Sequence, residues 1–121
     1  MNEYEAWHEA LERLAIAVQF TPGAARDFRT YHKDQKRTIL ALILKQAEKN
    51  PRMKPGGCGI PLHGELHGLV KIKSKATSLR VVYRPIERPD GTAVMEIIAI
   101  GPREREEVYR LAAQRIAKPE K

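Results

Sequence analysis

One stretch near the C-terminus constrains the fold more than any other part of the chain. Thr92 to Ile100 is almost wholly apolar from Val94 onward, which is typical of a strand buried on both faces. Gly101-Pro102 ends the run, and four apolar residues then follow at helical spacing: Val108, Leu111, Ala112 and Ile116. We therefore predict a central strand that leads directly into a C-terminal helix from about Glu104 to Ala117.

Two further strands precede this one. Leu69 to Lys75 alternates, with Val70 and Ile72 on one face and three lysines on the other: Lys71, Lys73 and Lys75. Leu79 to Ile86 also alternates and places Arg80 and Arg84 on one face. The short connection between them predicts an antiparallel hairpin in which Lys73 lies opposite Arg80. Pro89-Asp90-Gly91 predicts the next turn.

The N-terminal half is predominantly helical. Tyr4 to Leu14 has the apolar spacing of a short amphipathic helix, and Ile16 to Phe20 alternates like a strand. Thr21-Pro22 predicts the beginning of a helix, and Asp34 predicts the cap of another that ends at Asn50-Pro51. Pro51 to Gly68 is rich in Gly and Pro and is predicted to be a loop. It lacks the Lys-Ser/Thr continuation of a phosphate-binding loop.

These elements predict an α+β fold. The economical arrangement is an antiparallel sheet of about four strands with the helices packed on one side. A chain of 121 residues has room for one domain with one core. We therefore expect an N-terminal helical extension over residues 1–15 and a single domain over residues 16–121.

The charge balance indicates the kind of partner. The formal net charge is +7 at pH 7, which favours a polyanion or an acidic protein, although it can also serve solubility alone. Cys58 is the one cysteine, which excludes an intrachain disulfide and a multi-cysteine zinc site. There is no apparent signal peptide, and no apolar run is long enough to cross a membrane. We expect a cytoplasmic protein.

The predicted hairpin brings several cations to one face. Like charges on neighbouring strands are unfavourable unless an anion neutralises them. A single-stranded nucleic acid would supply its phosphates to five predicted RNA-binding residues: Lys71, Lys73, Lys75, Arg80 and Arg84. The alternative is a solvated, lysine-rich face that discourages aggregation at the sheet edge.

Arg103 and Tyr109 add candidate chemistry. Arg103 could clamp a phosphate and stabilise developing charge, or it could simply pair with a nearby glutamate. In a cationic pocket the pKa of the Tyr109 phenol should fall, so that it could accept a proton from a ribose 2′-hydroxyl; the alternative is a packing residue. His63 and His67 could form an acid/base pair or a metal site, but no carboxylate motif accompanies them, and we expect neither metal nor cofactor.

Three short motifs together resemble the RelE/ParE superfamily of type II toxins, and its RelE branch in particular: Lys71-Ile72-Lys73, Arg80-Val81-Val82-Tyr83 and Gly101-Pro102-Arg103-Glu104-Arg105-Glu106-Glu107-Val108-Tyr109. The resemblance spans about Ile16 to Ile116. It implies a compact fold with an antiparallel sheet and metal-independent cleavage of messenger RNA on the ribosome. It also implies a neutralising antitoxin, bound in a toxin–antitoxin hetero-oligomer.

The resemblance also implies a catalytic role for five residues. Lys71 and Lys73 match phosphate-contacting lysines, one of which helps to polarise the nucleophile. Arg80 matches a cation on the scissile phosphate, Arg103 a transition-state arginine and Tyr109 the general base. Two alternatives stay open, namely a ParE-like inhibitor of DNA gyrase without nuclease activity, and a basic RNA-binding or adaptor domain without chemistry. The N-terminal helix, the enlarged loop and Pro102 depart from the family pattern.

Overall fold

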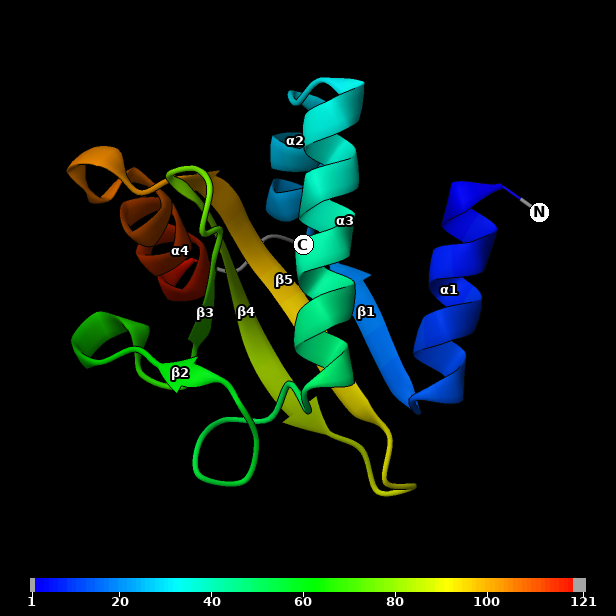
Figure 1. The fold of residues 1–121 in the computed structure, drawn as a ribbon. Coiled ribbons are helices and arrows are strands. Elements are labelled where there is room, and N and C mark those ends of the chain that lie inside the picture. The colour runs from blue at the N-terminus through cyan, green and yellow to red at the C-terminus, as the bar shows by residue number, and fades with distance from the viewer. Residues whose placement is uncertain (1, 119–121) are drawn as a thin grey trace.

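The computed structural model describes residues 2–118, which form four α-helices and one five-stranded sheet (Figure 1). Within this range no helix is both long and apolar enough to cross a membrane. Met1 and residues 119–121 lie outside the described residues. The predicted division into an extension over residues 1–15 and a domain over residues 16–121 remains a prediction. The elements are α1 (Glu3–Arg13), β1 (Ile16–Phe20), α2 (Pro22–Arg29), α3 (Lys33–Glu48), β2 (Ile60–Pro61), β3 (Val70–Lys73), β4 (Leu79–Glu87), β5 (Ala93–Pro102) and α4 (Glu107–Ala117).

The sheet confirms the α+β prediction and the predicted hairpin. Its strand order is β1-β5-β4-β3-β2. The sheet is mixed and not wholly antiparallel as predicted, because β1 runs parallel to β5, whereas the other neighbours are antiparallel. Lys73 lies opposite Arg80, because the short turn after β3 leaves little freedom in the register. The sheet has one strand more than expected, because two residues of the predicted loop, Ile60 and Pro61, pair with the edge of β3.

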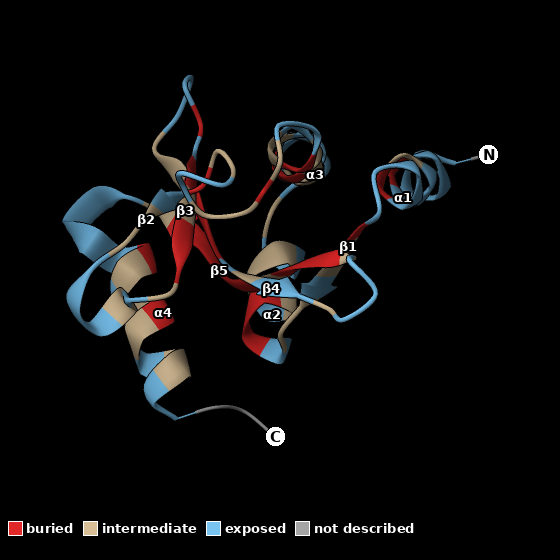
Figure 2. Cartoon of the chain, turned by 90° about the horizontal axis from the view of Figure 1, so that it is seen from below, coloured by how far each residue is buried: buried red, intermediate tan, exposed pale blue. Residues whose placement is uncertain are grey.

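One face of the sheet carries the larger core. Viewed from below, α1 and α3 lie on the same side of the strands (Figure 2). Ile39 and Ile43 of α3 are fully buried in this core, and α1 contributes Trp7 and Leu11. The Trp7 Nε1–H donates a hydrogen bond of 2.8 Å to the Leu40 carbonyl, which ties α1 to α3. The N-terminal helix is therefore part of the core packing.

The opposite face is covered by α4 (Figure 2), so the prediction that the helices pack on one side is wrong for this helix. Val108 and Ala112 of α4 are fully buried in a second, smaller cluster with Val82, Ile98 and Ala99. The reason lies in β5, whose apolar residues point to both faces. A strand buried on both sides needs cover on both sides, and α4 supplies the second layer.

The smallest helix, α2, occupies the edge of β5 beyond the end of β1. Pairing with β1 stops at Ile97, so the backbone groups beyond it need other partners. Asp27 accepts a hydrogen bond from the Ile100 N–H at 2.9 Å, and Arg115 of α4 donates one to the Ile98 carbonyl at 2.9 Å. Asp27 and Arg115 also form an ion pair of 2.7 Å. This pair joins α2, α4 and the sheet edge.

The helix beginnings confirm one predicted cap and correct another. Thr21 caps α2, and its Oγ1 accepts a hydrogen bond from the Ala24 N–H. The predicted cap at Asp34 is wrong, because α3 begins earlier, after His32. Gln35 accepts a hydrogen bond from the His32 N–H at 3.0 Å, and Asp34 stands in the first turn, where the helix dipole favours a carboxylate.

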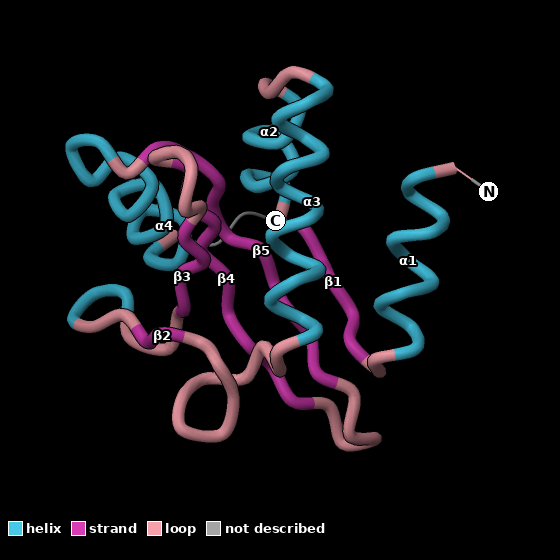
Figure 3. The backbone as a smooth tube through the Cα atoms, in the orientation of Figure 1, coloured by secondary structure: helices cyan, strands magenta, loops and turns pink. Residues whose placement is uncertain are grey.

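The long connection between α3 and β3 is anchored to the sheet. Figure 3 shows it as a wide loop interrupted by β2 and by a helical turn at Gly64–Leu66. The buried Tyr83 hydroxyl donates a hydrogen bond of 2.6 Å to the Pro51 carbonyl and accepts one of 3.0 Å from Gln46. The beginning of the loop is thereby fixed against the core.

Candidate active site

Three of the predicted cations share the sheet face that α4 covers. Lys73 lies opposite Arg80, and Arg80 in turn lies opposite Gly101. Lys71 lies opposite Val82, which packs in the α4 cluster. Gly101 has no side chain, so Val108 of α4 can pack over it, where an added Cβ would lie 3.5 Å from the Val108 Cβ. This arrangement brings the first turn of α4 close to the three cations.

Arg80 is the most deeply placed of these residues. It is only 7% exposed, which is unusual for an arginine. Its Nη1 donates a hydrogen bond of 2.9 Å to the Leu79 carbonyl and a longer one of 3.4 Å to Thr77. Its Nε has no hydrogen-bond partner. Among the buried side-chain nitrogen and oxygen atoms of residues 2–118, it is the only one without a partner. An unpaired donor on a buried cation fits a site that receives an anion.

A tight turn presents Arg103. The Arg103 N–H donates a hydrogen bond of 2.9 Å to the Ser78 carbonyl, which ties this turn to the β3–β4 hairpin. Arg105 and Glu106 both have left-handed backbone conformations, with φ of 56° and 59°, which are costly for residues other than glycine. The regular helix therefore begins at Glu107, later than predicted. Arg103 is exposed at the beginning of this turn.

Glu104 is held beside the hairpin in the same turn. A hydrogen bond from the Ser78 side chain, with smaller contributions from Arg103 and Arg80, lowers the pKa of Glu104. Its carboxylate is therefore already engaged with Ser78. This is a structural role for Glu104 in shaping the turn that carries Arg103.

Tyr109 lies on α4, half-buried beside the cations. The predicted fall in its pKa is wrong, because burial raises the pKa of the phenol and is the largest influence on it. The positive charge of Arg80 and a hydrogen bond from it act in the opposite direction, but Glu106 also raises the pKa. Tyr109 is therefore a protonated phenol near neutral pH and is better suited to donate a proton than to accept one.

The pKa of Lys71 is lowered, whereas that of Tyr109 is raised. Partial burial lowers the pKa of its ammonium group, and the positive charges of Lys73, Arg80 and Arg103 lower it further. Glu106 offsets part of this effect. The electrostatic coupling of Lys71 and Tyr109 to the same three residues, Arg80, Arg103 and Glu106, indicates that they share one site. Sequence reasoning missed Glu106, although it stands within the motif that contains Arg103.

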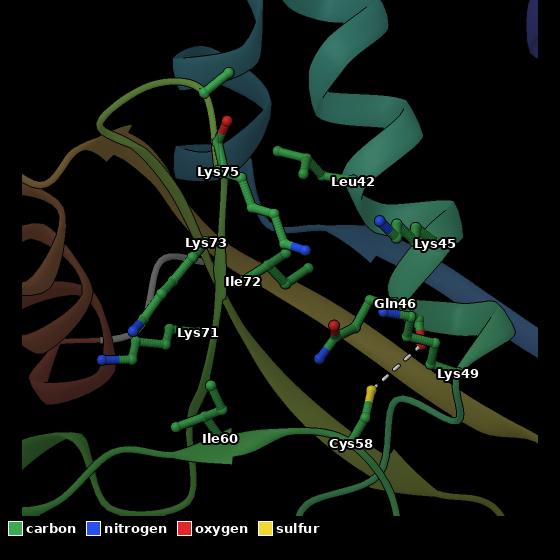
Figure 4. Close-up of a pocket in the computed structure, with 12 residues that line it drawn as sticks. Leu42, Lys45, Gln46, Lys49, Cys58, Ile60, Lys71, Ile72, Lys73 and Lys75 are labelled. Carbon is green, nitrogen blue, oxygen red and sulfur yellow. Dashed lines mark hydrogen bonds between the residues drawn. The ribbon is translucent and has the colours of Figure 1, made fainter.

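The two remaining predicted RNA-binding residues lie elsewhere. Arg84 is on the same strand as Arg80 but four residues further along, about 13 Å away, and it pairs with Glu96 at 3.6 Å. Lys75 does not continue the alternation of Lys71 and Lys73, because β3 ends at Lys73. Figure 4 shows the Lys75 side chain turned toward α3, whereas Lys71 and Lys73 point away from it.

The loop histidines are not both at this site. His63 and Tyr109 line one cleft of about 390 Å³ between the Gly64–Leu66 turn and α4. His67 follows the turn and does not line that cleft. Among the described residues there is no group of three or more His, Cys, Asp or Glu side chains placed to hold a metal ion.

Known proteins identify the family. No protein-family model matches the chain. The chain is 41% identical over 103 residues to an Escherichia coli protein named as a RelE-like toxin, a match that covers 85% of this chain and 99% of that protein. This chain belongs to the RelE-like toxins of toxin–antitoxin systems.

Solved structures agree with this assignment. A double arginine-to-alanine variant of E. coli RelE in the free state superposes with a TM-score of 0.62 at 25% identity, covering 83% of this chain and 96% of that one. The same variant in complex with an antitoxin RelB peptide gives a TM-score of 0.55 at 26% identity, covering 81% and 94%. These relatives favour the RelE-like over the ParE-like alternative.

Proposed function

We propose that this protein is an endoribonuclease that cleaves messenger RNA on the ribosome and thereby inhibits translation. The observation that carries the proposal is the placement of the buried, incompletely hydrogen-bonded Arg80 beside Lys71, Lys73, Arg103 and Tyr109. Four cationic side chains and one phenol gathered on one face of the sheet are suited to bind a phosphate diester. The family assignment supports the same conclusion.

The reaction would be an internal transfer within the RNA. The ribose 2′-oxygen attacks the adjacent phosphorus, the bond from phosphorus to the 5′-oxygen breaks, and the products are a cyclic phosphate and a 5′-hydroxyl. Arg80 and Arg103 stabilise the negative charge that develops on the phosphate oxygens. Lys73 contacts a phosphate, and the site needs one group to accept the proton of the 2′-hydroxyl and another to protonate the 5′-oxygen.

We assign these two proton transfers from the directions of the two pKa shifts, which support the following roles. Groups whose pKa values are driven apart in one site are natural acid and base partners. Lys71, whose pKa is lowered, accepts the proton of the 2′-hydroxyl as a neutral amine. Tyr109, whose pKa is raised, donates a proton to the departing 5′-oxygen. This reverses the role of general base that the family resemblance implies for Tyr109.

The nuclease activity is tested with purified protein, translating ribosomes and a defined messenger RNA. Arg103→Ala should lower the cleavage rate about 100-fold or more. Arg88→Ala, which removes the arginine that follows the end of β4, is the matched control and should cleave at the normal rate. Unchanged cleavage by the Arg103 variant would contradict the proposal. Salt-sensitive RNA binding without any cleavage would favour the adaptor alternative.

The proton assignment is tested with a substrate that carries sulfur in place of the bridging 5′-oxygen. A thiolate leaves without needing a proton, so the slow cleavage by Tyr109→Phe should be restored on this substrate. Lys71→Met should stay slow on both substrates. If the sulfur substrate does not restore the Tyr109 variant, then Tyr109 is not the acid.

We also infer that a cognate antitoxin binds this protein in a hetero-oligomer. The supporting observation is the similarity to E. coli RelE, a double arginine-to-alanine variant of which has been solved in complex with an antitoxin RelB peptide. Mixing the purified protein with the product of its neighbouring gene should form a complex and stop cleavage. Primer-extension mapping of transcripts after brief induction adds the in vivo test, because cuts that follow the reading frame require a ribosome.

A further inference from the structure

A groove rich in lysine lies on the other side of β3 from the candidate active site. It has a volume of about 380 Å³ and runs between the C-terminal half of α3 and the edge of the sheet. Lys45 extends from α3, Lys49 from the residue that caps its C-terminal end, and Lys75 from the segment after β3, as Figure 4 shows. Leu42, Ile60 and Ile72 form apolar parts of the wall.

The charge of this groove is not balanced from within the protein. None of the residues that line it is acidic. Over residues 2–118, no ion pair joins Lys45, Lys49 or Lys75 to a carboxylate. Several ammonium groups held around one groove repel each other unless an anion enters it. Protection of the sheet edge explains Lys75 at most, because Lys45 lies on α3 and Lys49 caps its end.

The groove communicates with the candidate active site around the edge of the sheet. β2 pairs only with Val70 and Lys71, so β3 is uncovered from Ile72 onward. Lys71 and Lys73 line part of the groove and also belong to the candidate active site. Because the same two lysines belong to both places, an RNA strand bound at the candidate active site can continue into the groove.

We propose that this groove binds the phosphate backbone of the same RNA strand that is cleaved, beyond the scissile phosphate. The inference rests on the proposed ribonuclease function and adds a second binding region to it. An RNA held at Lys71 and Lys73 presents its next phosphates to the groove at high effective concentration, which favours RNA over a separate acidic peptide. The enlarged Gly/Pro loop contributes Cys58 and Ile60 to the wall, so this loop helps to build the groove.

The test is a binding series in RNA length. The probes are RNAs of about 4 and about 12 nucleotides, with 2′-O-methyl groups throughout, so that no attacking hydroxyl is present and only binding is measured. The variant K45Q/K49Q/K75Q should bind the long RNA about tenfold or more weakly at moderate salt, and the magnitude of its log–log salt slope should fall by about 2. Its affinity for the short RNA should not change.

Two controls separate local contacts from overall charge. The variant R13Q/K33Q/K118Q also loses three exposed cations, but far from the groove, and should bind both RNAs normally. The variant K45R/K49R/K75R keeps the charge and should bind the long RNA like the unmodified protein. Thermal unfolding of all three variants establishes that they are folded.

The outcomes distinguish this inference from the proposed function. If K45Q/K49Q/K75Q loses equal affinity for both RNAs, or loses no affinity for the long RNA, then the groove does not bind the RNA backbone. Weakened antitoxin binding with normal RNA binding would also overturn the inference, because that result would make the groove a protein-docking surface. Cleavage is measured separately with the Arg103→Ala variant. If the protein binds long RNA through the groove but never cleaves it, only the proposed nuclease activity is refuted.

Discussion

Two buried polar side chains on opposite faces of the sheet have very different surroundings. Tyr83, on the α3 face, is fully buried, and its hydroxyl both donates to Pro51 and accepts from Gln46. Arg80, on the α4 face, is 7% exposed and leaves its Nε without a partner within residues 2–118. A buried polar group with complete hydrogen bonding serves the fold, whereas a buried cation with an unused donor indicates a place for a ligand.

The same contrast holds for the two faces as wholes. The α3 face joins residues from every long strand and three helices in one apolar core. The α4 face has a small apolar cluster beside a group of cations. Substitutions on the α3 face should therefore act on stability, and those on the open part of the α4 face should act on RNA cleavage.

The largest effect on stability should come from the ion pair that holds α4 to the rest of the molecule. Asp27→Asn removes the charge that neutralises Arg115, which is only 17% exposed in its side chain. Breaking a buried ion pair by removing one partner costs about 3–5 kcal/mol, and this pair is partly buried, so the free energy of unfolding should fall by about 3 kcal/mol. Urea denaturation measures the free energy of unfolding. Asp90→Asn, in the exposed turn before β5, is the control. A loss below about 0.5 kcal/mol would show that the pair does not hold α4 in place.

Arg80→Met should separate catalysis from stability. Removing a positive charge that stabilises the transition state lowers the cleavage rate about 100-fold to 1000-fold. Replacing a buried, incompletely hydrogen-bonded guanidinium by an apolar chain of similar length should leave the unfolding free energy unchanged or higher. Ribosome cleavage assays and urea denaturation of the same preparation give both values. Strong destabilisation would mean that Arg80 serves the fold, as Tyr83 does.

Tyr83→Phe is the matching substitution on the other face. It leaves Pro51 and Gln46 without their partner, which should cost about 1–3 kcal/mol of stability. The cleavage rate at a temperature where the protein is folded should be unchanged, because Tyr83 points away from the cations. A fall in cleavage with normal stability would show that the loop anchor influences the active site, contrary to the comparison.

The sequence was most informative where structure depends on neighbouring residues. The β3–β4 register, with Lys73 opposite Arg80, follows from a short turn and alternating side chains. The side of the sheet that α4 covers depends on packing between distant elements, and the alternation of lysines could not reveal that β3 ends before Lys75. The pKa of Tyr109 was predicted with the wrong sign, because the cations are visible in the motif but the burial of the ring is not.

Glu106→Gln gives the smallest expected effect and tests the electrostatics of the candidate active site directly. The Glu106 carboxylate raises the pKa of Lys71 by stabilising the ammonium form, against the burial and the cations that lower it. Glu106→Gln should therefore lower the pKa of Lys71 further. If neutral Lys71 is the base, the cleavage rate rises with pH up to that pKa, and the variant should show the same rise at lower pH. At a fixed pH below the pKa it should cleave faster than the unmodified protein, by less than tenfold.

Glu107→Gln is the matched control, because this neighbouring carboxylate is not among the groups that shift the pKa of Lys71. Its pH profile should coincide with that of the unmodified protein. If Tyr109 were the base instead, the rise would extend to high pH, because the pKa of that phenol is raised. If the rise in rate extends to high pH, disappears in Tyr109→Phe and persists in Lys71→Met, then Tyr109 is the general base, as the family resemblance implies. A rise that is lost in Lys71→Met and shifted in Glu106→Gln would place the proton acceptor on β3, on the same sheet face as the buried Arg80.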